Sequence, residues 1–239
     1  MPLERVLRSM CGRYSLFTPP DRLAERFGVS VPDDFPPRYN AAPGQQLPVV
    51  TAEHPDRLTY QKWGLVPSWS DDDTGGLINA RSETVHEKPA FREAYRARRC
   101  LVPADGFYEW VSTENGKQPY RVALEDDEPF AMAGLWERWT PSQKQTGLGD
   151  FGSGGPDRSV EPLETFTILT TDPNDLVSDL HHRMAVVLDP DAEERWLTED
   201  DPRDLFEPYP ADRMRAYPVS TLVNDPSNDS PALVEPRGS

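Results

Sequence analysis

The sequence predicts a mixed α+β fold (α/β mixed), built mostly from antiparallel sheet with a few peripheral helices. Short apolar runs alternate with turn residues along most of the chain, which is typical of strands. The 26 prolines are too many for a helical bundle. The 239 residues suffice for one large domain or two small ones. Hydrophobic content is only 36%, but six Trp, eight Tyr and nine Phe can fill a core.

The apolar runs that predict strands are each bounded by turn residues. They cover residues 47–51, 58–65, 118–124, 130–136 and 165–171. Three further segments have helical character. Residues 21–27 predict a short helix that begins at Asp21 as N-cap and ends at Gly28. Residues 89–99 predict a second helix with proline early, and residues 191–197 a third, after Asp189 and Pro190.

Residues 140–162 are rich in Gly, Ser, Pro and Asp and have almost no apolar periodicity. They predict a mobile loop inserted between two strands of one sheet, so we do not place a domain boundary there. The tail from Asn224 is polar, and only Leu233 and Val234 are suited to anchor it. We therefore expect a single domain over residues 10–236, preceded by an extension, residues 1–9, that is absent from the mature protein.

The chain carries 25 basic and 41 acidic residues, a net charge of −16. Polyanion binding needs local positive charge, so this balance alone argues against nucleic acid. Adaptation to high salt is the alternative: at about 1 M salt the Debye length is about 3 Å, and local arginines then decide binding. Two cysteines, Cys11 and Cys100, exclude a disulfide framework and a Cys-only zinc site, which suits a reducing cytosol. The sequence has no apolar run near the roughly 18 residues of a membrane span, and we expect a cytoplasmic protein.

Residues 10–14 (MCGRY) place Cys11 directly after a methionine. If translation begins at Met10 and that residue is removed, Cys11 carries both a free α-amine and a thiol. The amine has a pKa of about 7.7–8.0, so part of it is uncharged near neutrality. It can form a Schiff base with an aldehyde, after which the thiol closes a thiazolidine ring. The alternative is that Cys11 is an ordinary buried cysteine acting as a small hydrophobe.

Six further patches stand in order along the chain. They are residues 38–44 (RYNAAPG), 63–69 (WGLVPSW), 77–84 (LINARSET), 98–110 (RRCLVPADGFYEW), 133–137 (AGLWE) and 181–185 (HHRMA). With the MCGRY start, they make the chain resemble the SRAP family (SOS response-associated peptidase), whose members crosslink to abasic sites in single-stranded DNA. The resemblance runs from Met10 to about Pro236. It implies a compact, barrel-like domain with no cofactor and no metal, and we expect a monomer.

The resemblance implies four catalytic residues. Cys11 would capture the aldehyde of the opened abasic sugar, and Asn79 would hold the sugar's hydroxyl through its amide. Glu109 would relay protons, with a pKa raised by desolvation between Tyr108 and Trp110; the alternative is that Glu109 pairs with an arginine. His181, two residues before an arginine, would be the catalytic histidine, although a single histidine is more often structural.

The resemblance also implies DNA contacts. Arg13 and Arg81 would grip phosphate, which arginine does with two parallel hydrogen bonds. Trp69 and Pro43 would wedge against bases beside the lesion, while we expect Trp63 in the core; the alternative is that both tryptophans are core. The remaining candidates are Arg38, Arg98, Arg99 and Arg183 as phosphate contacts and Thr170 as a hydrogen-bonding residue near Glu109. Any of these arginines is alternatively an ordinary surface residue.

The leading hypothesis is a DNA-damage sensor that forms a covalent thiazolidine with abasic sites in single-stranded DNA and protects the lesion, with possible AP-lyase activity by β-elimination. It would be nucleoid-associated when bound to DNA. With residues 1–10 attached, the nitrogen of Cys11 is an amide, so they must be lost first, either because Met10 is the start or by cleavage. A self-processing cysteine peptidase using Cys11 and His181 is the alternative. A third possibility is a single-strand binder without chemistry.

Overall fold

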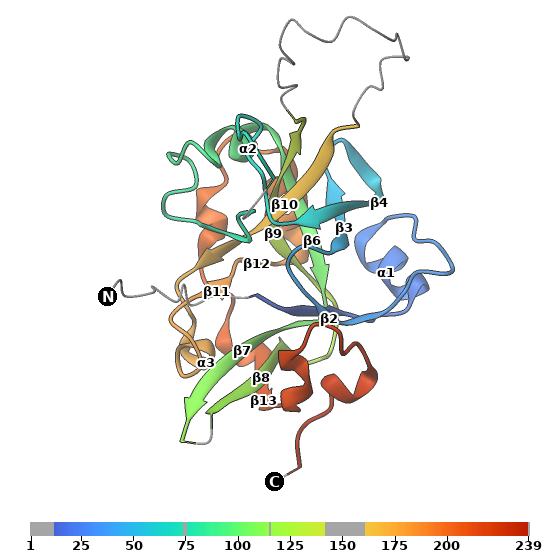
Figure 1. Cartoon of the computed structure of the whole chain (residues 1–239), viewed down its shortest axis with the longest axis vertical. Coiled ribbons are helices and arrows are strands. Elements are labelled where there is room, and N and C mark those ends of the chain that lie inside the picture. Colours follow the sequence, from blue (N-terminus) through green and yellow to red (C-terminus); the bar gives the residue numbers. More distant parts are fainter. Residues whose placement is uncertain (1–11, 74–75, 115, 142–160, 239) are drawn as a thin grey trace, which may run out of the picture.

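A computed structural model describes residues 12–73, 76–114, 116–141 and 161–238. Cys11, the expected extension 1–9 and most of the expected loop 140–162 lie outside these residues. The predictions made for them are not tested by the structure. Within the described residues the chain forms two sheets with helices at their margins (Figure 1), which confirms the mixed α+β prediction.

The smaller sheet, as far as the described residues show, has five strands. Its order is β13 (Met214–Pro218), β8 (Gly116–Leu124), β7 (Gly106–Thr113), β1 (Tyr14–Leu16) and β2 (Arg38–Ala41), all antiparallel. The β1 strand lies between β7 and β2, so the residues that follow Cys11 are in the middle of a sheet and their backbone is held from both sides. The first strand is therefore a fixed element, and the sequence prediction missed it.

The larger sheet is mixed and partly closed. Five of its strands form a ring in the order β10 (Leu163–Thr171), β4 (His54–Trp63), β3 (Gln46–Thr51), β6 (Arg99–Ala104) and β9 (Phe130–Trp139), with β9 pairing back to β10. The short strands β5 (Asn79–Arg81) and β11 (Met184–Ala185) pair with β10, and β12 (Val187–Leu188) pairs with β9. The pairings of β10 with β4 and β5 are parallel; the others are antiparallel.

The helices of the described residues are short and lie at the periphery (Figure 1). They are α1 (Pro20–Phe27), α2 (Arg92–Ala97), α3 (Asp175–Ser178) and α4 (Pro190–Thr198). Four 3-10 turns follow in the C-terminal part: η1 (Arg203–Phe206), η2 (Ala211–Arg213), η3 (Thr221–Asn224) and η4 (Pro231–Leu233). Helix α1 ends at Gly28 with φ 63°, as predicted, but it begins after Pro19, so Asp21 lies in its first turn and is not the N-cap.

Two predicted elements end earlier in the structure than the sequence predicts. The strand expected over 58–65 ends at Trp63, because the next residue, Gly64, has φ 130°. The backbone of Gly64 lies against Gly76, and a Cβ added at Gly76 would be 2.4 Å from the Gly64 carbonyl oxygen. The helix expected over 89–99 is only α2, because Arg99 pairs with Leu135 as the first residue of β6. Pairing with a buried strand outweighs local helix propensity here.

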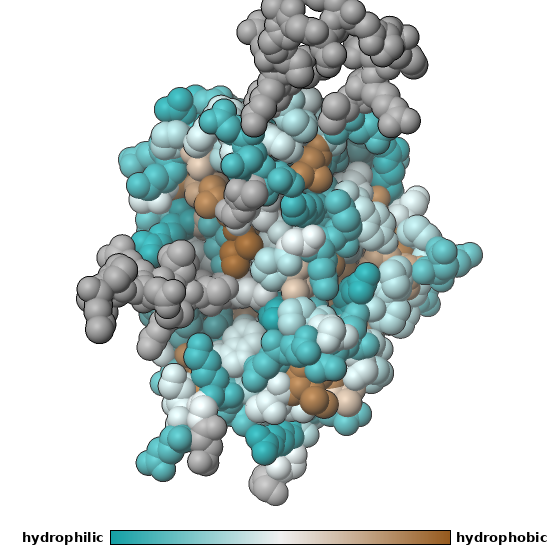
Figure 2. Space-filling view, viewed as in Figure 1, coloured by the Kyte–Doolittle hydropathy of each residue, from teal (hydrophilic) through white to brown (hydrophobic). Residues whose placement is uncertain are grey.

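An aromatic stack joins the two sheets. The ring of Tyr14, on β1, lies 5.3 Å from that of Trp63, on β4, and Trp63 lies 6.1 Å from Phe166, on β10. All three side chains are buried, so Trp63 is a core residue as predicted. On the face drawn in Figure 2, apolar side chains lie in separate spots among hydrophilic ones, so that face has no continuous apolar surface.

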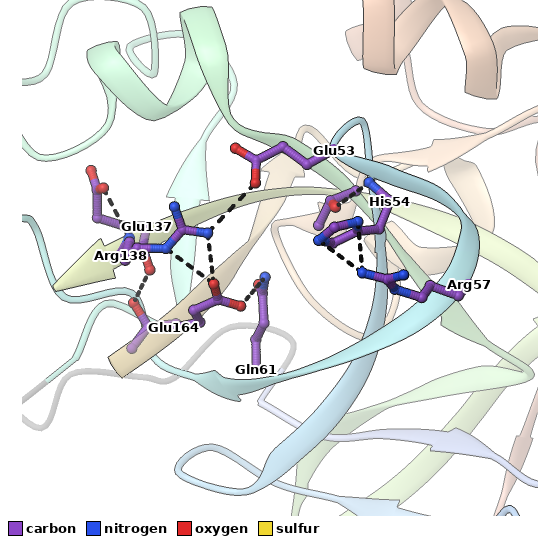
Figure 3. A network of polar contacts seen from close by, with 9 residues as sticks. Glu53, His54, Arg57, Gln61, Glu137, Arg138 and Glu164 are labelled. Atoms are coloured by element: carbon purple, nitrogen blue, oxygen red, sulfur yellow. Dashed lines mark hydrogen bonds and ion pairs between the residues drawn. The ribbon is translucent and has the colours of Figure 1, made fainter. Parts of the chain in front are cut away.

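A polar network braces the strands that flank residues 142–160 (Figure 3). Arg138 on β9 and Glu164 on β10 are register partners, and the guanidinium Nη2 of Arg138 lies 2.8 Å from a carboxylate oxygen of Glu164. Glu53 lies 3.5 Å from the same guanidinium, and Gln61 donates to Glu164. Gln61 is buried, but the ion-paired side chains of Arg138, Glu53 and Glu164 are partly exposed, so the network fixes the register of β9 and β10 more than it stabilises the fold.

Candidate functional site

The first group of predicted site residues lies on β1 and β7. Tyr14 pairs with Phe107, and the amide of Tyr108 donates to the carbonyl of Arg13 at 3.0 Å. Arg13 therefore lies beside the backbone that leads to Glu109. Glu109 is 2% exposed and Tyr108 is fully buried, so the expected burial of this carboxyl group is confirmed.

The guanidinium of Arg13 is held by the C-terminal part of the chain. Its Nη1 donates to Asn40 Oδ1 at 2.9 Å and to the carbonyl of Val223 at 2.6 Å, and its Nη2 donates to the carbonyl of Asn224 at 3.3 Å. Burial lowers the pKa of Arg13, while the nearby carboxylate of Asp225 raises it. An arginine stays charged through such shifts, so Arg13 is a positive charge whose guanidinium group is held in one orientation.

The second group lies on β5 and β10, which run parallel. Asn79 is opposite Ile168 and Arg81 is opposite Thr170. Thr170 is fully buried, and its hydroxyl donates to the carbonyl of Ala80 at 3.4 Å. Arg81 is exposed, and no ion pair engages its guanidinium within the part of the chain that the structure describes.

His181 lies in the turn after α3 and is half-buried. Its backbone amide donates to the carbonyl of Val177 at 2.8 Å. The amide of Arg183 donates to Nδ1 of His181 at 3.2 Å, and the carbonyl of Arg183 lies 3.2 Å from the same nitrogen. The neutral ring accepts from the amide and carries its proton on Nε2, whereas a protonated Nδ1 donates to the carbonyl. The turn can satisfy either protonation state, as an acid–base residue requires.

Arg183 ties the histidine turn to β5 and β10. Its side chain is 8% exposed and contacts the carboxylates of Glu83 and Asp172, with Nη2 lying 2.8 Å from Glu83 Oε2 and 2.6 Å from the carbonyl of Thr170. Burial raises the pKa of Glu83, but the hydrogen bonds and charge of Arg183 lower it by more, so the net shift of this pKa is downward. Arg183 was predicted to contact phosphate; in this structure its guanidinium is committed to carboxylates.

The aromatic stack connects the two groups. Tyr14 follows Arg13 directly and packs on Trp63, whose Nε1 donates to the carbonyl of Ile78 at 2.9 Å. Ile78 immediately precedes Asn79. One buried tryptophan therefore separates the start of β1 from the start of β5, and it fixes the position of both.

The predicted base-stacking residues are on the surface. Trp69 is 67% exposed, and Pro43 is exposed. The loop that carries Trp69 is held from beneath, because Trp139 Nε1 donates to the carbonyl of Ser70 at 2.8 Å. An exposed ring on an anchored loop is available to a base; the contact itself stays a prediction.

The other predicted phosphate contacts have partners in the structure. Arg38 pairs with Asp229 at 3.2 Å and Arg98 with Glu137 at 2.8 Å. Arg99 is 4% exposed and donates from Nη1 to the carbonyl of Tyr95 at 2.7 Å, a structural role. Phosphate would have to compete with an ion-paired carboxylate at Arg38 and Arg98. Within the described residues Arg81 forms no such ion pair, although its charge acts on the carboxylate of Glu83.

Sequence reasoning missed two residues at this site. Asn40 lies in the singled-out patch 38–44 but was given no role, although its side chain contacts Arg13. Glu83 lies in the patch 77–84 and pairs with Arg183, 100 residues away. A contact over such a separation leaves no local spacing signal, so only the folded chain reveals it.

The chain matches a known protein family over most of its length. The family model described as SOS response associated peptidase (SRAP) matches residues 10–226. The chain belongs to the SRAP family. It is 41% identical over 238 residues to Abasic site processing protein YoqW of Bacillus subtilis, covering 95% of this chain and 99% of that protein. It is 35% identical over 224 residues to Abasic site processing protein HMCES of Gallus gallus, covering 84% of this chain and 67% of that protein.

Solved structures of other proteins share the fold. An X-ray structure of a protein from Bacteroides thetaiotaomicron superposes with a TM-score of 0.79 at 29% identity, covering 95% of this chain and 100% of that one. A structure from Bordetella bronchiseptica gives a TM-score of 0.73 at 27% identity, covering 88% and 100%. Within the described residues, no helix is both long and apolar enough to cross a membrane.

Proposed function

We propose that this SRAP protein processes abasic sites in single-stranded DNA by forming a covalent thiazolidine through Cys11. The observation that supports it most is that the buried Trp63 contacts both Tyr14, which follows Arg13, and the carbonyl of Ile78, which precedes Asn79. The strand that follows Cys11 and the start of β5 are therefore anchored to the same tryptophan. The printed names of its relatives, abasic site processing proteins, point to the same substrate.

The chemistry requires a form of the chain that begins at Cys11. The α-amine attacks the aldehyde carbon of the ring-opened deoxyribose, and loss of one water gives a Schiff base. The thiolate sulfur then adds to the imine carbon while the nitrogen takes up a proton, which closes the thiazolidine ring. The net change is protein plus DNA less one water, with no oxidant or reductant.

Glu109 and His181 are the proposed proton carriers. The buried carboxyl group of Glu109 would pass a proton to the departing hydroxyl out of contact with bulk water. His181 has a donor and an acceptor for its Nδ1 within 3.2 Å, which lets it change protonation state without losing a partner. The Schiff base is also the species from which β-elimination would cleave the strand, so the same intermediate would give the proposed lyase activity.

DNA would bind through local charge in spite of the net charge of −16. Arg81 is exposed and supplies a phosphate contact without giving up a carboxylate. Trp69, 67% exposed, supplies a stacking surface worth about 1–3 kcal/mol per base. Since most of the surface repels phosphate, binding should strengthen at moderate salt before counterion competition weakens it.

The test is intact-mass spectrometry on protein that begins at Cys11, before and after mixing with a single-stranded oligonucleotide carrying one abasic site. We expect a heat-stable adduct of protein plus DNA less one water, absent in Cys11→Ser. Glu109→Gln should slow its formation, and Asn79→Ala should reduce crosslinking more than non-covalent binding. An absent adduct with the free N-terminal cysteine verified would refute the proposal.

A cysteine peptidase using Cys11 and His181 is the second candidate, and the family's description as a peptidase favours it. The same samples discriminate between the two. A peptidase would remove residues preceding Cys11 from a chain that starts at Met1, and Cys11→Ser would retain them. It would form no adduct with the oligonucleotide.

A further inference from the structure

Asn40 is buried on β2, with 1% exposure, and its side chain links Arg13 to the C-terminal segment. Its Oδ1 accepts from Arg13 at 2.9 Å. Its Nδ2 donates to the carbonyl oxygens of Val223, Asp225 and Asn228 at 3.2, 3.0 and 2.9 Å. Carbonyl oxygens only accept, so Nδ2 must face them, and Oδ1 must face Arg13. The amide has one orientation only.

The bonds to Arg13 use one part of its guanidinium. Both hydrogens of Nη1 are taken, by Asn40 and by the carbonyl of Val223, and one hydrogen of Nη2 goes to the carbonyl of Asn224. A guanidinium has five N–H donors. The Nε hydrogen and the second Nη2 hydrogen of Arg13 take no part in these three bonds. Together they form the edge that arginine uses for two parallel hydrogen bonds to a phosphate.

Asp229 anchors the segment that supplies these carbonyls. Its Oδ1 accepts from the backbone amides of Tyr39 and Asn40 at 2.6 and 3.2 Å, and its Oδ2 accepts from Arg38 at 3.2 Å. The C-terminal segment accordingly lies against β2 (Figure 1). Asp229 lies past residue 226, where the match to the family model ends.

We propose that Asn40 is a positioning residue, which acts with the carbonyls of the segment 223–229 to aim the Nε–Nη2 edge of Arg13 at a DNA phosphate. Arg13 is two residues from Cys11 in sequence, and two residues of chain span at most about 7 Å. The phosphate that Arg13 grips is therefore close to the nucleotide that reacts. The segment 223–229 is part of the DNA site without touching DNA. This inference rests on the proposed role of Arg13 as a phosphate contact.

A double-mutant cycle tests this coupling. The probe is a single-stranded oligonucleotide with a tetrahydrofuran abasic analogue, which has no aldehyde and reports non-covalent binding only. Arg13→Ala and Asn40→Ala should each weaken binding by about tenfold, the effect of one charge-assisted hydrogen bond. Each should lower the slope of log K against log salt by about 0.7, as expected for one phosphate contact on a single strand. In the Arg13→Ala background, Asn40→Ala should have no further effect.

A purely structural Asn40 would give a different result, because the two losses would then multiply in the double variant. That outcome would overturn the proposal. If Asn40→Ala does not fold, Asp229→Ala takes its place in the cycle, since it releases the segment while keeping the amide. Thr198→Ala is the control: it removes one hydroxyl from the surface of α4, where that hydroxyl donates to the carbonyl of Glu194, so binding should be unchanged.

A measurement without DNA separates this inference from the proposed function. Two hydrogen bonds to Nη1 hinder rotation about the Nε–Cζ bond of Arg13, which should give resolved Nη proton signals by NMR in the free protein. Asn40→Ala should average them, and Thr198→Ala should not. Averaged signals in the unaltered protein would overturn the proposal. A protein that forms no adduct but shows resolved signals and a non-additive cycle would instead refute only the crosslinking chemistry.

Discussion

Arg183 and its partners Glu83 and Asp172 form a clamp that holds the turn of His181. Replacing Glu83 by Gln removes one negative charge from this clamp. Arg183 is 8% exposed at its side chain, so it depends on its carboxylate partners, whereas the Glu83 side chain is 48% exposed. Breaking a fully buried pair costs about 3–5 kcal/mol, and an exposed pair contributes about 0–1 kcal/mol. Asp172 remains at 2.8 Å from Arg183. We therefore expect a loss of about 1–2 kcal/mol in the free energy of unfolding at pH 7.

The pH dependence supplies a sharper test of the same substitution. Burial raises the folded-state pKa of Glu83, but the hydrogen bonds of Arg183 outweigh burial and leave this pKa lowered. The ion pair therefore stabilises the folded protein fully above the unfolded-state pKa of about 4.3. It is lost as the pH falls through the folded-state value. The difference between the unaltered protein and Glu83→Gln should thus be constant from pH 6 to pH 8 and shrink below about pH 4.

The assay is urea unfolding at several pH values, with crosslinking rates measured in parallel. Glu53→Gln is the control, since Glu53 lies 3.5 Å from an exposed arginine and should change stability by less than about 0.5 kcal/mol. Equal stability of Glu83→Gln and the unaltered protein at pH 7 would refute the reasoning, and so would a difference that persists unchanged in acid. Arg183 holds His181 through its backbone amide and carbonyl. Crosslinking by Glu83→Gln should therefore be slower than by the unaltered protein, even where both are fully folded.

Three further predictions follow from packing and exposure. Burial raises the pKa of Cys100 far above its usual range, so iodoacetamide should leave this thiol unmodified in the folded protein and modify it in urea; modification of the folded protein would contradict its burial. Gly134→Ala should lower the free energy of unfolding by about 1–3 kcal/mol in urea titrations, because the new Cβ would lie 2.8 Å from Cys100 Sγ and 2.9 Å from Val102 Cγ2. Trp69→Ala should weaken binding to the tetrahydrofuran oligonucleotide by about 1–3 kcal/mol while the unfolding midpoint stays within error; equal binding would remove Trp69 from the DNA surface.

Five of the strands and three of the helices in the described residues could be predicted from the sequence, because their signals are local. The apolar runs at 130–136 and 165–171 lie within β9 and β10, and the prediction over 191–197 lies within α4. The missed strands include β1, β2 and β5, of three or four residues each, and also β13, β6 and β7, of five, six and eight residues. A run of three or four residues is too short to show a period, and the conformation of these strands is imposed by their neighbours in the sheet.

The sequence by itself determined the family and which residue types carry the chemistry, since motifs such as MCGRY and the Asn-Ala-Arg of residues 79–81 are contiguous. Only the tertiary structure decided what each arginine does. Arg81 remains exposed, Arg183 is buried against Glu83, and Arg13 is held by carbonyls more than 200 residues away. The reason is physical: a guanidinium pairs with whichever acceptor the fold brings within about 3 Å, and that distance is set by sheet pairing and not by spacing along the chain.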